Sequence, residues 1–153
     1  MAISRRTILK MAAQGGMVLG AVLAAPKVLL AAWSESAFNA KTEDEAMSAL
    51  LGETGATASD KVTLKAPDIA ENGAVVPIKV ASSLDNVESI SIFVSKNPSP
   101  LAASFDIPEG TEAKVAVRIR MGKSSQVTAV VKAGGKLYSA STEVKVTIGG
   151  CGG

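Results

Sequence analysis

Apolar and polar residues alternate with a period of two through much of the chain after Lys61. Between Lys114 and Met121, every second residue is Val, Ile or Met. Successive side chains of a strand point to opposite faces, so this pattern predicts a strand with one buried face. Similar runs predict further strands, and they cover Val62–Leu64, Ala74–Ala81, Ser89–Ser95, Ala102–Ile107, Gln126–Lys132, Lys136–Ser139 and Glu143–Ile148. Short strands separated by frequent turns favour a mainly β fold, an antiparallel immunoglobulin-like β-sandwich.

Turn residues refine this prediction at three places. Gly134-Gly135 between two predicted strands indicates a hairpin. Pro77 lies inside an apolar strand, which fits an edge or a bulge. Asn97–Pro100 reads Asn-Pro-Ser-Pro and predicts a rigid, exposed loop. Two explanations stay open for the proline strand and this loop: contact with another subunit, or simply a blunted edge and a solvated loop.

One short helix is predicted between Lys41 and Gly52. Thr42 and Glu45 have the spacing of a capping box, acidic residues fill the first turn, and Gly52 stands where a helix ends. Met47, Leu50 and Leu51 form its apolar stripe, which we expect to pack on the domain.

The first residues of the chain have the pattern of a twin-arginine export signal. Arg5 and Arg6 are followed by apolar residues and Lys10, and the stretch 11–25 is only mildly apolar before Pro26 interrupts it. A membrane span needs about 20 uninterrupted apolar residues, so a cleaved signal explains the segment better than an anchor. We therefore expect a periplasmic protein without stable membrane association, cleaved between Ala32 and Ala37.

These observations divide the chain into four parts. They are a twin-arginine signal peptide over 1–34, an N-terminal helical segment over 35–60, a β-sandwich domain over 61–148 and a C-terminal arm over 149–153. Roughly 120 residues after the signal are enough for one hydrophobic core.

The charge balance changes once the signal is removed. The chain has 16 Lys and Arg residues and 14 Asp and Glu residues. Four of the basic residues lie in the signal, so the mature protein has a net charge of about −2. This balance does not indicate nucleic-acid binding.

Histidine is absent and Cys151 is the only cysteine. The sequence therefore excludes histidine acid–base chemistry, the usual zinc and copper ligand sets and an intramolecular disulfide. We predict no catalytic residue, no metal site and no resident cofactor. A lone cysteine in an exported protein suggests either intermolecular pairing or a free reactive thiol.

The chain ends in Gly-Gly-Cys-Gly-Gly, so Cys151 is flanked by Gly149, Gly150, Gly152 and Gly153. Glycine has no Cβ, and a flexible, thin arm of this kind can enter a narrow channel in a second protein. An enzyme holds its nucleophile still, whereas this arm fits a carrier. No cation, helix N-terminus or metal is indicated beside the thiol, so the receiving protein must drive the chemistry. The alternative is a disordered tail whose cysteine is incidental.

The signal, the sandwich and the terminal GGCGG together resemble the SoxY family, the sulfur-carrying subunits of the Sox thiosulfate-oxidation system. The segment Ala66–Pro77, the Asn97-Pro98 loop, the strand Val117–Met121 and the closing stretch Val144–Gly153 are similar to that family as well.

The resemblance implies that Cys151 bears sulfur intermediates covalently. A haem enzyme would couple thiosulfate to the thiol, a hydrolase would release sulfate, and a sulfane-dehydrogenase-type enzyme would act on the remaining sulfur. The four arm glycines would let Cys151 reach each active site. The resemblance also implies a SoxZ-like subunit as heterodimer partner, exported together with this chain in folded form.

Two further classes remain open at the level of sequence. A structural periplasmic module would use Cys151 for an intermolecular disulfide dimer. A thiol enzyme is disfavoured because the sequence supplies neither histidine nor an activating cation near the thiol.

Overall fold

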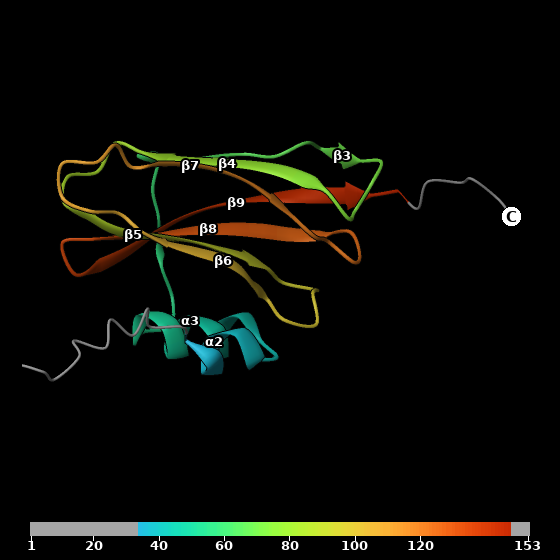
Figure 1. The fold of residues 1–153 in the computed structure, drawn as a ribbon, viewed down its shortest axis with the longest axis horizontal. Coiled ribbons are helices and arrows are strands. Elements are labelled where there is room, and N and C mark those ends of the chain that lie inside the picture. The colour runs from blue at the N-terminus through green and yellow to red at the C-terminus, as the bar shows by residue number, and fades with distance from the viewer. Residues whose placement is uncertain (1–33, 148–153) are drawn as a thin grey trace, which may run out of the picture. The chain divides into compact units, whose positions relative to one another are not determined.

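Two β-sheets face each other in the computed structural model, which describes residues 34–147 (Figure 1). The predicted mainly β, antiparallel immunoglobulin-like sandwich is confirmed. All but the last residue of the predicted signal peptide and the whole predicted arm lie outside the described residues.

The larger sheet has six strands. Its main path runs β1-β9-β8-β5-β6, and β3 pairs with β9 beside that path. The pairs among β5, β6, β8 and β9 are antiparallel, whereas β1 and β3 run parallel to β9. The bounds are Thr57–Ala58 for β1, Ile69–Ala70 for β3, Val87–Val94 for β5, Leu101–Asp106 for β6, Ser125–Ala133 for β8 and Lys136–Val146 for β9.

Strand β9 differs from the prediction. Two strands were expected over 136–139 and 143–148, but a single strand of 11 residues covers Lys136–Val146. Ser141 and Thr142, which break the apolar alternation, stay in register with Thr128 and Val127 of β8. Pairing with a neighbouring strand therefore overrides the local gap in the pattern.

The smaller sheet has the strand order β2-β4-β7 and is antiparallel throughout. Its strands are β2 Val62–Lys65, β4 Val76–Ser82 and β7 Lys114–Ile119. Pro77 lies in β4, the central strand, yet β2 ends at Lys65 opposite Lys79. Pro77 therefore pairs only with Arg118 of β7. At this residue β4 has no partner on its other side, so Pro77 occupies an edge position as predicted.

The main hydrophobic core lies between the two sheets. It is built from inward positions that alternate along each strand, as the period of two predicts. The buried residues are Val62, Ala70, Val76, Ile78, Val80, Ile90, Ile92, Val94, Ile119, Met121, Val127, Ala129, Val131 and Val144.

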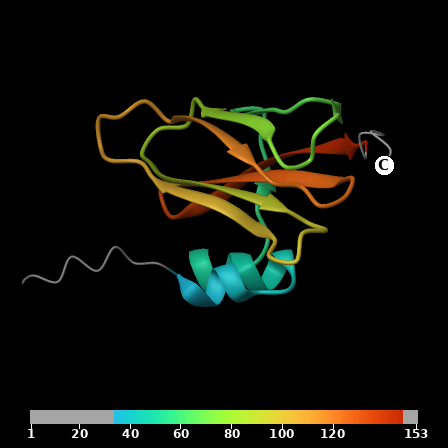
Figure 2. The ribbon, with the colours of Figure 1, turned by 45° about the vertical axis from the view of Figure 1, so that its right-hand side comes forward.

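Two helices cover the other face of the larger sheet (Figure 2). Helix α3, Glu43–Leu51, confirms the predicted helix: the reciprocal capping box of Thr42 and Glu45 is present, and Gly52 ends the helix in a left-handed conformation at φ +80°. Helix α2, Glu35–Asn39, was not predicted. Among the described residues, no helix is long and apolar enough to cross a membrane.

A second core joins these helices to the sheet. Its members come from both helices, from the residue after α2 and from four strands, and they are Ala37, Ala40, Ala46, Met47, Phe93, Leu101, Val130 and Leu137. Phe93 lies on the face of β5 that the alternation leaves outside the main core, yet it is fully buried because the helices cover it. The Asn97–Pro100 loop is also less exposed than predicted, since Pro100 is buried and the Ser99 hydroxyl donates to the carbonyl of Phe38.

Candidate functional site

The predicted site residues lie beyond the described part of the chain. Cys151, the four glycines around it and the export residues Arg5 and Arg6 are all outside residues 34–147. The structure does describe the point from which the C-terminal residues leave the sandwich. We call Lys145, Val146 and Thr147 the end of β9.

On one side, the end of β9 is held by β3. Ile69 pairs with Lys145 and Ala70 with Val146 in parallel register. The Lys145 N–H donates to the carbonyl of Asp68 at 2.9 Å, and the Thr147 N–H donates to the carbonyl of Ala70 at 3.1 Å. Thr147 is thus the last residue that the structure shows bonded to the sandwich.

On the other side, one side chain completes the pairing. The hydroxyl of Ser124 accepts the Val146 N–H at 2.9 Å and lies 3.4 Å from the Val146 carbonyl, to which it can donate. Ser124 immediately precedes β8, which begins at Ser125. Its hydroxyl therefore satisfies backbone groups of Val146 in the part-buried position where a strand partner would otherwise be needed.

Gly73 lets a loop approach this region closely. The Met121 N–H donates to the Gly73 carbonyl at 2.7 Å. A Cβ at position 73 would collide with the Met121 carbonyl oxygen and would lie 2.8 Å from Cγ1 of Val146. Only glycine fits between Met121 and Val146 here without displacing one of them.

The segment on either side of Gly73 also carries two exposed apolar side chains. Among the described residues, Ile69 and Val75 are the large hydrophobic side chains that stay exposed, at 57% and 49%. An Asx turn shapes the loop between them, because Oδ1 of Asn72 accepts the Ala74 N–H at 2.9 Å. Apolar surface is therefore available next to the end of β9.

The distance from Thr147 limits where Cys151 can act. Four residues at about 3.3–3.6 Å each span at most about 14 Å, to which the cysteine side chain adds its own length. Any protein that reacts with Cys151 must bring its reactive group within that distance of the end of β9.

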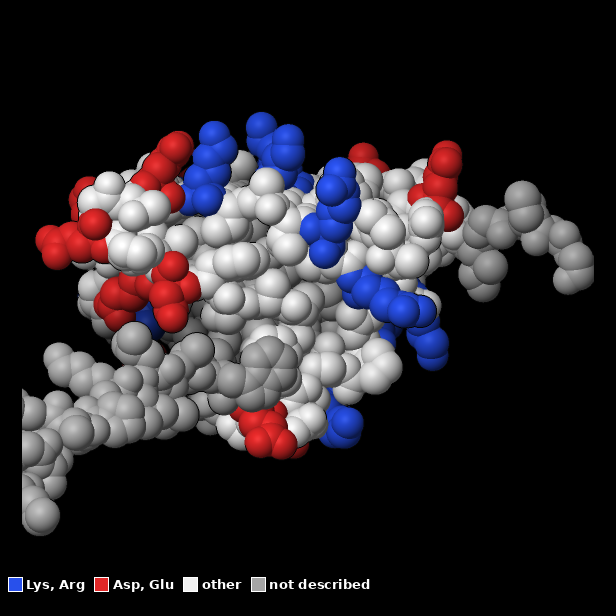
Figure 3. Space-filling model, viewed as in Figure 1, with Lys and Arg blue, Asp and Glu red and all other residues white. Residues whose placement is uncertain are grey.

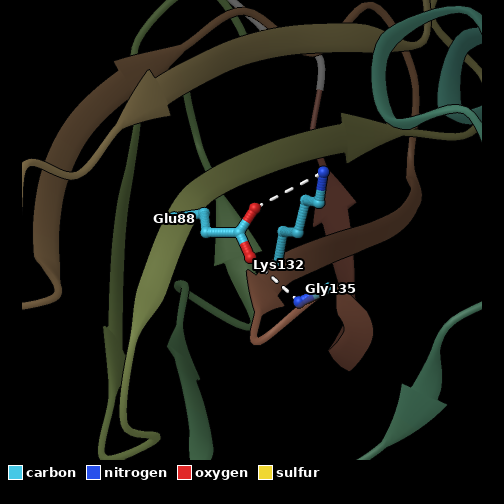
Figure 4. Close-up of polar contacts among 3 residues, drawn as sticks. All are labelled: Glu88, Lys132 and Gly135. Atoms are coloured by element: carbon cyan, nitrogen blue, oxygen red, sulfur yellow. Dashed lines mark hydrogen bonds and ion pairs between the residues drawn. The ribbon is translucent and has the colours of Figure 1, made fainter.

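Residues 34–147 contain no group of three or more His, Cys, Asp or Glu residues that could hold a metal ion. One carboxylate, Glu88, is perturbed: the Gly135 N–H, at 2.9 Å, and then Lys132 lower its pKa below the ordinary value of 4.5, against an opposing effect of burial (Figure 4). Glu88 lies by the hairpin at the opposite end of β9, so it has no part in this site.

Sequence reasoning did not assign Ser124, Gly73 or Asp68–Ala70 to a site. A two-residue strand such as β3 has no alternation to detect, and Ser124 stands in an ordinary turn sequence. The segment 66–77 stood out only through its resemblance to a family, and in the structure this segment holds the end of β9.

Two comparisons with known proteins give matches, and a third gives none. The model of the family described as sulfur oxidation protein SoxY matches residues 47–151 and thus includes the cysteine. The sulfur carrier protein SoxY from Chlorobium limicola f thiosulfatophilum is 48% identical, with a TM-score of 0.63 over 69% of this chain and 96% of its own. A search of curated proteins found no match.

A more distant likeness concerns the fold alone. The superoxide reductase (neelaredoxin) from Ignicoccus hospitalis is 16% identical, with a TM-score of 0.51 over 57% of this chain and 80% of its own. The shared feature is therefore the architecture of the sandwich.

Proposed function

The chain belongs to the SoxY family of sulfur oxidation proteins, and we propose that it is a periplasmic sulfur carrier that bears thiosulfate-derived sulfur on Cys151. The observation that supports this most directly is that the family match extends to residue 151, the only cysteine of the chain. The 48% identical protein is itself described as a sulfur carrier protein.

The carrier cycle begins with oxidative coupling. The Cys151 thiol and thiosulfate form a sulfur–sulfur bond, losing one proton and two electrons to a haem enzyme, and give a cysteine S-thiosulfonate. Water then cleaves the bond to the terminal sulfone, releasing sulfate and two protons and leaving a persulfide anion on Cys151. A sulfane-dehydrogenase-type enzyme then takes six electrons from the outer sulfur, which gains three oxygen atoms from water as six protons leave. Hydrolysis of the resulting S-sulfonate releases a second sulfate and one proton and restores the thiol. Each step is catalysed by a partner, so the chain itself is a substrate carrier without turnover.

The residues of this chain contribute position rather than catalysis. Hydrogen bonds from Thr147 to Ala70 and from Val146 to Ser124 fix where the C-terminal residues begin. The four glycines beyond that point add no side-chain bulk around the sulfur. A fixed base with a thin extension is the arrangement that lets one thiol serve several enzyme channels.

Partners and location belong to the same proposal. Family membership supports a heterodimer with a SoxZ-like subunit, and the Arg5-Arg6 pattern supports export by the twin-arginine pathway. Helix α2 narrows the expected cleavage window. Ala37 is fully buried and the Phe38 carbonyl accepts the Ser99 hydroxyl, so cleavage within α2 would remove residues that pack on the sheet. These contacts support a cleavage site between Ala32 and Glu35.

The variant Cys151→Ser tests this function. With thiosulfate and the partner enzymes, we expect the variant to take up no sulfur and to support no sulfate release, while its thermal unfolding and its heterodimer remain those of the wild type. Sulfate release at the wild-type rate by the serine variant would refute the carrier role. If Cys151 of the wild-type protein forms only disulfide dimers under these conditions, the structural module is favoured instead.

A further inference from the structure

The outward face of the smaller sheet is strongly basic. Strand alternation directs Val and Ile residues into the core and leaves the charged positions in between pointing to solvent. Figure 3 shows Lys and Arg side chains along the upper part of the molecule, where β4 and β7 lie in Figure 1. The basic face, as we define it, consists of Lys65, Lys79, Lys114, Arg118 and Arg120, and all five are exposed.

Few ion pairs within residues 34–147 neutralise these charges. Among the described residues, only Lys114 of the five forms an ion pair, with Glu112 at 3.9 Å, and both side chains of that pair are highly exposed. Lys65 and Lys79 stand directly opposite each other in the register of β2 and β4. Like charges at opposed positions destabilise a sheet, so the stability of this domain gives no reason for the arrangement.

The rest of the described surface has the opposite charge. Residues 34–147 contain all 14 acidic residues and twelve of the Lys and Arg residues. With five cations on the basic face, seven remain elsewhere against fourteen carboxylates. A polyanion such as nucleic acid or an anionic membrane would be repelled by the net negative charge of the rest of the protein. A local acidic surface on another protein matches a basic face of limited size better.

The basic face extends to the end of β9. Arg120 is followed by Met121, whose N–H donates to the Gly73 carbonyl. Gly73 in turn lies against Val146, so Arg118 and Arg120 stand on the side of the face nearest to the C-terminal residues. A protein that accepts Cys151 must come within about 14 Å of Thr147, and this brings it beside that part of the face.

We propose that the basic face docks an acidic surface of the proteins that accept the Cys151 segment. This inference rests on the proposed carrier function and adds to it a recognition surface. Small residues between the cations, Pro77, Ala81 and Ala116, let a partner surface approach closely. Charge complementarity of this kind chiefly raises the association rate and makes it fall with salt.

The test is a charge reversal with a matched control. Lys79→Glu/Arg118→Glu alters the basic face, and Lys41→Glu/Lys136→Glu makes the same change in net charge at exposed positions outside it. The association rate of each mature heterodimer with the sulfate-hydrolase-type Sox enzyme is measured at low and high salt. We expect the first variant to associate at least about tenfold more slowly at low salt and to lose most of its salt dependence. The control should stay within about twofold of the wild type.

Equal association rates for the two variants would overturn the proposal. Binding to vesicles of phosphatidylglycerol and phosphatidylcholine is measured as well, because an anionic membrane is the competing ligand for the basic face. If Lys79 and Arg118 affect only vesicle binding, the proposal is wrong. Should Lys79→Glu/Arg118→Glu misfold, Lys79→Gln/Arg118→Gln gives the same comparison with a smaller expected loss. Cys151→Ser separates this inference from the carrier function, because it should associate at the wild-type rate while taking up no sulfur.

Discussion

At one end of β9 the chain turns back through Gly134 and Gly135, and at the other it leaves the sandwich through Thr147 toward Cys151. The first end is closed by neighbours in sequence, with φ values of +55° and +72° at the two glycines. The second is held by residues 22 and 77 positions away, Ser124 and Ala70. The closed end connects β8 to β9. We interpret the other as the base from which a reactive cysteine is presented, and this difference can be tested at both ends.

The largest expected effect is on sulfur transfer. We expect Gly150→Val to slow loading of Cys151 and its reaction with each partner enzyme at least about tenfold, because a branched side chain beside the thiol obstructs a narrow channel. Gly150→Ala should show a smaller loss. Since both changes lie beyond Thr147, unfolding midpoints should stay unchanged. Loading of the valine variant at the wild-type rate would contradict the thin-arm interpretation.

Next in size is the close approach at Gly73. We expect Gly73→Ala to lower the free energy of unfolding by about 1–3 kcal/mol, since its Cβ would collide with the Met121 carbonyl and Val146. Gly122→Ala is the matched control, because its Cβ would meet only Oδ1 of Asn97 at 3.9 Å. Urea unfolding measures the stability of both variants. Similar stabilities for the two would show that position 73 has room for a side chain.

A smaller loss is expected at Ser124. Replacement by alanine leaves the part-buried Val146 N–H without its partner at 2.9 Å and should cost about 1 kcal/mol. Amide hydrogen exchange at Val146 and Thr147 should accelerate, whereas exchange at the hairpin end of β9 stays as in the wild type. Ser83→Ala, at an exposed position whose side chain makes no described hydrogen bond, serves as the control. Unchanged protection at Val146 would exclude this role of Ser124.

The smallest expected effect is at the closed end and depends on pH. The Gly135 N–H and Lys132 lower the pKa of Glu88 in the folded state, so its ionised form stabilises the fold above the unfolded value of 4.5. That contribution is lost as the pH falls through the lowered pKa. Glu88→Gln should therefore be slightly less stable than the wild type at pH 7, with the difference vanishing in acid. A constant difference across this range would mean that the charge of Glu88 is not responsible.

Local signals in the sequence predicted much of the fold but little of the site. Three signals that depend on residues close in sequence are confirmed: the alternation that begins at Lys114, the capping box of Thr42 and Glu45, and the hairpin glycines. Strand β7 itself ends at Ile119, two residues before the predicted end. Helix α2 was missed because five residues carry too weak a pattern, and β3 because two residues carry none.

The contacts around the end of β9 and the basic face arise only through folding. Ser124 meets Val146, and Gly73 meets Met121, across long stretches of chain. A count of charges gave a net value near −2, whereas strand register places Lys65 opposite Lys79 and brings Arg118 onto the same face. Composition alone cannot reveal this separation of charge.

The central claim is that Cys151 carries sulfur, and an intact mass of the mature protein tests it most directly. The protein is purified without reductant from cells grown with thiosulfate and from cells grown without it, and peptide mapping locates any added mass. We predict sulfur adducts on Cys151 that appear only with thiosulfate and vanish on reduction, on a chain that begins between residues 33 and 35. A bare thiol or a simple disulfide dimer in both cultures would contradict the carrier function.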